Sequence, residues 1–232
     1  MSKKEILVVL VLLFCFKSTA QSKNDSLSLN FKAKFNTLPI ELNQSYTTKN
    51  KDTITITTFR CYVSNIEIQY SDHTIFKEKN SYHLLDLENP VSLLIPLTLK
   101  SNKQITKLIF NIGIDSLTNT SGALTGDLDP IKGMYWAWQS GYINMKIEGT
   151  SPSCHTRKHE FQFHLGGYFQ PYYAMRQIKF ELDKRADNDI TIAIDLNDFF
   201  SNIQLSETNS IMIPGKQAMQ LADYSTKMFH LE

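Results

Sequence analysis

Short segments in which apolar and polar residues alternate recur along almost the whole chain, and they constrain its fold more than any other feature. In residues 27–35 the apolar side chains occupy every second position without a break. Residues 53–57 read Thr-Ile-Thr-Ile-Thr, an alternation built from β-branched residues. Because successive side chains of a strand point to opposite faces, this period predicts strands with one buried face. We predict further strands at 59–69, 82–87, 107–112, 141–147, 160–164, 177–182 and 190–196.

The spacing of these segments indicates the fold class. Clusters of polar turn residues separate them at fairly regular intervals, which is typical of an antiparallel sandwich or barrel. After Pro214-Gly215, however, the apolar residues follow helical spacing among good helix formers. We therefore predict an all-β protein, an antiparallel β-sandwich with long loops and a short C-terminal helix that begins near Lys216. A short helical turn is expected at 198–202.

The first twenty residues have the pattern of a secretory signal peptide. Two lysines precede an apolar run from Ile6 to Phe16, and Ser18-Thr19-Ala20 supplies the small residues that signal peptidase reads. The run is shorter than the roughly 20 residues that span a bilayer. We expect residues 1–20 to be removed and the mature protein to be exported, to the periplasm or the cell surface, with no transmembrane segment.

The remaining chain divides simply. Residues 21–26 are polar and are expected to be disordered, and residues 27–232 are expected to form a single domain. Cys15 raises the question of a lipid anchor, but the bulky Phe14 stands where a small residue is expected. We therefore predict that the protein is not a lipoprotein.

Charge and cysteine content limit the partners. The full chain has a formal net charge of +1, and removal of residues 1–20 takes away three lysines and one glutamate, which leaves −1. A nearly neutral chain without a basic cluster argues against nucleic acid as a partner. The mature chain keeps Cys61 and Cys154. A disulfide and two free thiols both remain open, because spacing carries no geometry.

Both tryptophans of the chain lie in residues 133–142, which read Gly-Met-Tyr-Trp-Ala-Trp-Gln-Ser-Gly-Tyr. In an extended strand this spacing places Trp136 and Trp138 on one face together with Met134. Such a face of soft, polarizable side chains is either core or a site for a soft metal such as Cu(I). Spacing alone favours the core interpretation.

The histidines that follow are the other candidate ligands, because neutral imidazole suits copper. His164 alternates with Phe161 and Phe163, so it belongs to the more polar face of its strand. His159 would not share that face, and His155 lies in a predicted loop that follows Ser151-Pro152-Ser153. The alternative for His164 is a histidine at the core edge that bonds to backbone.

Short motifs spread along the mature chain also match a known family, in the same order. They read Arg-Cys-Tyr-Val-Ser-Asn-Ile at 60–66, Tyr-His-Leu-Leu-Asp at 82–86, Phe-Asn-Ile-Gly-Ile-Asp-Ser at 110–116, Leu-Asp-Pro at 128–130, the tryptophan segment at 133–142, Lys-Ile-Glu-Gly at 146–149, His-Leu-Gly at 164–166 and Met-Ile-Pro-Gly at 212–215. In these motifs the chain resembles the MbnP family. Its members are exported proteins encoded beside genes for the copper chelator methanobactin, and the copper-binding proteins MopE and CorA are relatives.

The resemblance implies a β-sandwich that binds one copper ion, as Cu(I) or Cu(II). In characterised relatives, histidines and a kynurenine made from tryptophan hold the copper, and a separate di-haem peroxidase performs the oxidation. Carried over by motif, His164 is the expected histidine ligand and Trp136 or Trp138 is the residue to be oxidised. Met134 and His159 complete the candidate metal-site residues. Position 138 is Trp, where a Trp-x-His arrangement would supply a second histidine.

The sequence also bears on a second metal and on catalysis. Within the 115–129 loop, Asp115, Asn119, Asp127 and Asp129 supply oxygen ligands of the kind that calcium prefers, and an acidic loop with ordinary turns is the alternative. The sequence has no Gly-x-Ser-x-Gly, His-Glu-x-x-His or phosphate-binding glycine motif, so we predict that it is not an enzyme.

These observations lead to one predicted function and one alternative. We predict an exported, non-catalytic copper-binding protein that acts in copper acquisition or handling. The alternative is a metal-free interaction module of the cell envelope on the same β-sandwich scaffold.

Overall fold

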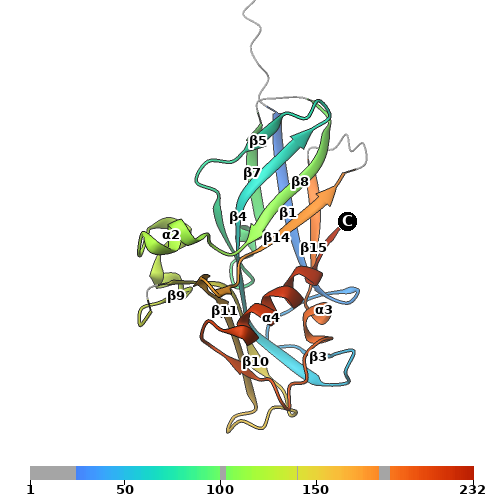
Figure 1. The fold of residues 1–232 in the computed structure, drawn as a ribbon. Coiled ribbons are helices and arrows are strands. Elements are labelled where there is room, and N and C mark those ends of the chain that lie inside the picture. Colours follow the sequence, from blue (N-terminus) through green and yellow to red (C-terminus); the bar gives the residue numbers. More distant parts are fainter. Residues whose placement is uncertain (1–24, 100–102, 140, 183–188) are drawn as a thin grey trace, which may run out of the picture.

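The structure is a computed structural model, and it describes residues 25–99, 103–139, 141–182 and 189–232 (Figure 1). The predicted signal peptide at 1–20 lies outside the described residues, as does most of the 21–26 segment. The first strand, β1, begins at Asp25, so the last two residues of the segment predicted to be disordered belong to a strand. Within the described residues, no helix is long and apolar enough to cross a membrane.

The strands form two large sheets and a small hairpin. One sheet has the order β17-β15-β1-β2, with β7 also paired to β1, and the other has the order β14-β8-β4-β10-β11-β16, with β3, β5, β6 and β9 at its sides. β12 and β13 form the hairpin. The bounds are β1 Asp25–Phe35, β2 Leu38–Pro39, β3 Ser45–Thr47, β4 Thr53–Tyr70, β5 Ile75–Lys77, β6 Tyr82–Asp86, β7 Leu94–Leu99, β8 Ile105–Ile112, β9 Tyr135–Trp136, β10 Gly141–Thr150, β11 Glu160–Gly166, β12 Tyr168–Phe169, β13 Tyr172–Tyr173, β14 Arg176–Glu181, β15 Asp189–Asp195, β16 Ser210–Ile211 and β17 Phe229–Leu231.

The apolar faces of the two sheets pack together, which confirms the all-β sandwich. Phe31 of β1 meets Phe110 of β8 edge to face, with ring centroids 5.8 Å apart, and Phe110 also meets Phe229 of β17 at 5.9 Å. These rings join one sheet to the other through the core. Phe31 and Phe110 come from segments in which apolar and polar residues alternate, and Phe229 comes from the C-terminal strand. Burial of such rings is the main contribution that holds two sheets face to face.

Strand direction differs from the prediction in two places. β1 pairs with β15 in parallel, and β11 pairs with β16 in parallel, whereas the other described strand pairs are antiparallel. Alternation shows which side chains share a face. It does not show which strand is the neighbour in the sheet, or whether that neighbour runs parallel or antiparallel. The chain ends near the β1–β15 pair, because β17 adds to β15 as an antiparallel edge strand.

The segments at 53–57 and 59–69, predicted separately, form one long strand, β4. Along one edge it pairs first with β10, through residues 55–61, and then with β8, through residues 63–70. β3, β6 and β5 follow one another along the opposite edge. Since β8 and β10 lie end to end, the chain between them leaves the sheet halfway along β4. Figure 1 shows α2 and β9 of this segment to the left of the long strands.

This side lobe has its own small core. The buried side chains that form it are Tyr62, Leu84, Ile114, Leu128, Met134, Trp136, Tyr142 and Ile143. The hydroxyl of Tyr142 donates to the carbonyl of Leu128 at 3.0 Å, and that of Tyr62 donates to the carbonyl of Asp127 at 2.9 Å. The region predicted to be a long loop therefore contains the helix α2 (Ser116–Thr120) and two 3-10 turns, η2 (Gly126–Leu128) and η3 (Pro130–Lys132).

The C-terminal helix begins where the sequence predicts. α4 covers Lys216–Ser225 and buries Ala218, Leu221 and Ala222. It is shorter than the apolar spacing suggests, because the chain passes through the turn η4 (Thr226–Met228) and then enters β17. One further 3-10 turn, η1 (Pro90–Leu93), precedes β7.

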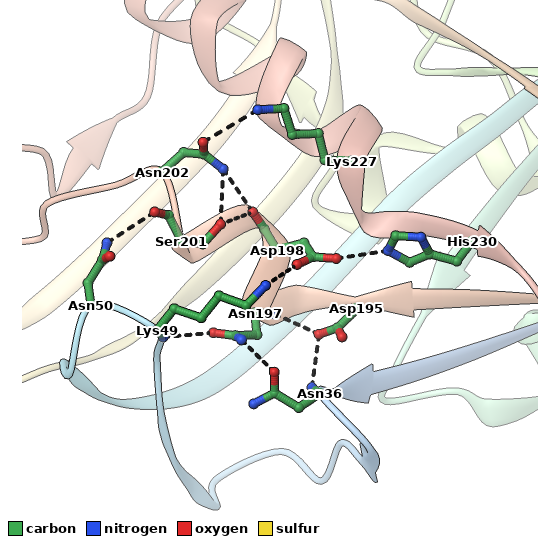
Figure 2. Close-up of polar contacts among 10 residues, drawn as sticks. All are labelled: Asn36, Lys49, Asn50, Asp195, Asn197, Asp198, Ser201, Asn202, Lys227 and His230. Carbon is green, nitrogen blue, oxygen red and sulfur yellow. Dashed lines mark hydrogen bonds and ion pairs between the residues drawn. The ribbon is translucent and has the colours of Figure 1, made fainter.

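The short helix α3 (Leu196–Phe200) confirms the predicted helical turn and is fastened by a polar network (Figure 2). The carboxylate of Asp198 accepts from Lys49 Nζ at 2.7 Å and lies 2.8 Å from His230 Nε2. Burial acts to raise the pKa of Asp198, but the hydrogen bonds from Lys49 and His230 outweigh it and lower the pKa. The network thus ties α3 to the loop before β4 and to the C-terminal strand β17.

Candidate metal site

His164 lies on the outer face of β11, near the lobe. The interior face of this strand carries Phe161, Phe163 and Leu165, which belong to the main core. His164 therefore points away from the sandwich interior, as the alternation predicts, and stands directly across from Lys146 of β10. Its exposed fraction is nevertheless only 7%. A histidine this well covered on an outer face must lie beneath other side chains.

The imidazole of His164 is held by a carboxylate. Its Nε2 lies 2.6 Å from Oε1 of Glu148, a half-buried residue on the same face of β10. The hydrogen bond from His164 lowers the pKa of Glu148, so the carboxyl group is ionised at neutral pH and must accept. Nε2 then carries the proton, and in a neutral imidazole Nδ1 keeps its lone pair. A carboxylate that orients a histidine in this way is a common outer partner of metal ligands.

Trp136 lies beside His164 on the same face. The six-membered ring of its indole occupies the space above Gly166, where a Cβ atom would come within 2.6 Å of the ring carbon Cζ3. Gly166 follows His164 by two positions on β11, so the two share a face and their Cα atoms are about 7 Å apart. Trp136 is 6% exposed and reaches this place because β9 pairs with the start of β10, with Trp136 opposite Gly141.

The two other soft residues of the tryptophan segment have different surroundings. The ring of Trp138 contacts that of Trp136, with centroids 5.9 Å apart and planes inclined by 49°, but Trp138 is 63% exposed. Met134 is fully buried in the lobe core. The two rings are in contact, but Trp138 lies in a turn and not in the extended strand that the same-face prediction assumed, so one indole is buried and the other faces solvent.

The structure does not bring His159 to His164. His159 is exposed, has a φ of 56° and lies in the turn before β11, where its Nδ1 is 3.0 Å from the carbonyl oxygen of Cys154. Roughly 16 Å of extended chain separates it from His164. Of the predicted residues, His164 and Trp136 therefore share one face of β11, and Trp138 contacts Trp136. Met134 is buried in the same cluster as Trp136, and His159 lies at the other end of the strand.

Two cations that the sequence reading missed fasten the tryptophan segment to this face. Nη1 of Arg60 donates to the carbonyl of Lys132 at 3.1 Å, and Nζ of Lys146 donates to the carbonyl of Gly133 at 2.5 Å. Burial lowers the pKa of Lys146. The sequence places Lys146 and Glu148 at alternate positions among the apolar residues of their strand, which marks its polar face, but the pattern does not show which groups they contact.

With this geometry established, comparison with known proteins places the chain in a family. The family model described as MbnP matches residues 24–213. The chain belongs to the MbnP family. The solved structure of MbnP from Methylosinus trichosporium is similar with a TM-score of 0.62, covering 79% of this chain and 80% of that chain at 14% identity. At this identity the likeness shows the fold alone. No curated protein matches the chain significantly in sequence.

In this MbnP-family chain the acidic groups of the 115–129 loop serve as caps and local braces. Asp115 caps α2 by accepting from the backbone N–H of Thr118 at 2.9 Å. Asp127 accepts from the N–H of Leu84 at 3.1 Å, and Asp129 accepts from that of Ile131 at 3.0 Å. Each of these carboxylates thus has a hydrogen-bonding role within the fold, and calcium binding by this loop stays a prediction.

The other side chains that could bind a metal do not form a cluster in the described part of the chain. Among the described residues, no group of three or more His, Cys, Asp or Glu side chains is arranged to hold a metal ion. Cys61 and Cys154 are both buried and free, which answers the question that their spacing left open. Burial raises the pKa of the Cys61 thiol, and it raises that of Cys154 to about 11, so neither is a thiolate at neutral pH.

Proposed function

We propose that the chain is an exported copper-binding protein that acts in copper acquisition or handling without turning over a substrate. The observation that carries the proposal is the placement of the Trp136 indole against Gly166, beside His164 on one face of β11. Family membership supports the same conclusion, because the resemblance to MbnP proteins implies copper held by histidine and an oxidised tryptophan.

The chemistry of the side chains explains why oxidation matters. An unmodified indole offers only an N–H donor, so Trp136 as encoded is a poor metal ligand. Kynurenine carries an aromatic amine and a ketone and is able to coordinate. Trp136 is the better candidate for this change than Trp138, because it lies next to His164. We propose a di-haem peroxidase partner as the source of the oxidation.

The donor set fits a copper ion only in part before oxidation. His164, oriented by Glu148, supplies one imidazole nitrogen, and the oxidised Trp136 would supply the second donor. Cu(I) accepts such low coordination numbers, whereas Cu(II) prefers a tetragonal set. The arrangement therefore favours Cu(I), with His164 and residue 136 as the groups that would hold it.

Metal analysis of protein purified from its native host tests the proposal. We expect copper in the wild type and its loss in His164→Ala. His159→Ala is the matched control, since it removes an exposed histidine of the same loop-and-strand region, and it should keep its copper. Copper-free wild-type protein would contradict the proposal and favour the metal-free envelope module. Copper that survives His164→Ala would contradict the assignment of His164 as a ligand.

Export is a separate part of the proposal and has its own test. It is supported by the basic, apolar and small-residue pattern of residues 1–20. Protein recovered from outside the cytoplasm should begin at Gln21, as read by N-terminal sequencing. Mature protein that retains Met1 and fractionates with the cytoplasm would contradict export and leave the copper site itself untouched.

A further inference from the structure

The contact between the two indoles joins a buried ring to the solvent. Trp136, at 6% exposure, offers almost no surface to a molecule outside the protein. Trp138 is 63% exposed and its ring centroid lies 5.9 Å from that of Trp136. Indole is among the most easily oxidised protein side chains. The pair therefore provides an oxidisable path from the surface to the residue beside His164.

We propose that Trp138 is an electron relay through which an external oxidant reaches Trp136. The inference rests on the proposed function, in which Trp136 is oxidised, and it adds the route. A one-electron oxidant, such as a ferryl haem, takes one electron from Trp138 and is reduced by one electron. Trp138 becomes an indole radical cation. Trp136 then passes one electron to Trp138, which restores Trp138 and leaves the radical cation on Trp136.

The surroundings of Trp138 suit this role. Gln139, the next residue, lines a shallow hollow of about 310 Å³ with Gly167, Tyr168, Phe169, Gln170, Tyr172 and Pro214. The described residues that line it are all uncharged, and Phe169 is 62% exposed. The exposed Trp138 thus immediately precedes, in the chain, a residue that lines an uncharged, aromatic hollow, which leaves its indole open to an oxidant in solution.

A small soluble oxidant tests the relay without copper or a partner protein. Tris(bipyridine)ruthenium(III), generated by light with persulfate in aerated buffer, would be applied to the full mature chain. Trypsin cleavage after Lys132 and Lys146 yields one peptide with both indoles, and its fragment ions report oxidation at 136 and at 138 separately. In the wild type we expect oxidation to accumulate at Trp136.

Two substitutions separate a relay from a packing role. Trp138→Phe keeps an aromatic ring but not an oxidisable one, and it should slow oxidation at Trp136 by an order of magnitude or more. Trp138→Tyr fills the position similarly and remains oxidisable, so it should restore most of the rate. Tyr172→Phe, which removes a partly exposed phenol on the β12–β13 hairpin, is the control and should have no effect.

The outcomes are decisive in both directions. Equal rates at Trp136 in wild type and Trp138→Phe would overturn the relay, as would wild-type oxidation confined to Trp138. Equal slowing in the Phe and Tyr variants would assign position 138 a packing role and would also overturn it. Native protein without copper or kynurenine would refute the proposed function and leave the result of the ruthenium experiment standing, so the two failures are distinguishable.

Discussion

At the scale of single residues, Gly166 shows how closely the site is fitted. An added Cβ would lie 2.6 Å from Cζ3 of Trp136 and 2.8 Å from the carbonyl oxygen of Tyr142. Real Cβ atoms do not approach other atoms so closely, so any larger residue forces the indole or the strand to move. The absence of a side chain at 166 is what lets Trp136 lie beside His164.

Gly166→Ala should therefore displace the indole and destabilise the fold by about 1–3 kcal/mol, the usual cost of overpacking. Intrinsic tryptophan fluorescence would report the new environment of Trp136, and urea unfolding would report the free energy. Gly215→Ala is the matched control, because a Cβ there meets no atom within 4 Å. A Gly166→Ala protein with unchanged fluorescence and stability would show that Trp136 does not lie on Gly166.

The Glu148–His164 pair should make stability depend on pH in a defined direction. The hydrogen bond from His164 lowers the pKa of Glu148 from 4.5, so the folded state binds its proton less tightly than the unfolded state. The pair thus contributes stability above pH 4.5, and the contribution is lost as pH falls through the lowered, folded-state pKa. Glu148→Gln should cost about 1 kcal/mol at neutral pH and progressively less in acid.

Urea unfolding of wild type and Glu148→Gln across this pH range provides the measurement. Glu67→Gln is a suitable control. Glu67 lies on a part of β4 distant from His164, and it pairs with the exposed Lys77 of β5. If the difference between wild type and Glu148→Gln stayed constant from neutral pH into the acid range, the carboxylate would not be held ionised by His164.

Sequence reading identified the residues of the site better than their surroundings. The i, i+2 spacing was interpreted as one extended strand that carries both indoles. It could not show that β9 ends at Trp136, so that Trp138 falls in the turn that follows and faces solvent. Glu148 was missed because its role depends on the β10–β11 register, which no pattern within one strand encodes.

At the scale of elements, the tryptophan segment depends on two cations of the sheet. Arg60 on β4 and Lys146 on β10 stand opposite each other in register and donate to the consecutive carbonyls of Lys132 and Gly133. β9 itself is only two residues long, so its own ladder is weak. The cations therefore supply much of what keeps Trp136 in place.

Lys146→Met should loosen this segment while keeping the aliphatic part of the side chain. We expect faster amide hydrogen exchange at residues 134–138, because local opening follows the loss of a hydrogen bond that holds a short element. Exchange read by mass spectrometry is the measurement, with Lys77→Met on the exposed β5 as the control. Unchanged protection in Lys146→Met would assign the anchoring to the lobe core instead.

The elements themselves were largely predictable from the sequence. Each strand expected from alternation is a strand, with ends that differ by a few residues. The short strands such as β12 and β13 lack a long enough pattern to be recognised. The fusion of two segments into β4 was not foreseen, because the alternation is interrupted at Thr57 and Thr58, where the register of β4 against β10 shifts inside one continuous strand.

At the scale of the whole molecule, the sandwich is the scaffold and the lobe carries the tryptophan segment. The likeness to MbnP from Methylosinus trichosporium at 14% identity shows that the fold tolerates extensive sequence change. A shared fold does not by itself carry a function, so the copper proposal depends on residues at one place. The site around His164 and Trp136 forms because β8 and β10 pair end to end along one edge of β4. The chain between these two strands therefore leaves the sheet and forms the lobe.

The central claim is that oxidation of Trp136 completes a copper site with His164. Peptide mass mapping of the copper-bearing fraction of the native protein tests it most directly, through the fragment that runs from Gly133 to Lys146. We predict kynurenine at position 136 in the copper-bearing chains and unmodified tryptophan in the copper-free ones. Stoichiometric copper in chains whose two indoles are both intact would contradict the account.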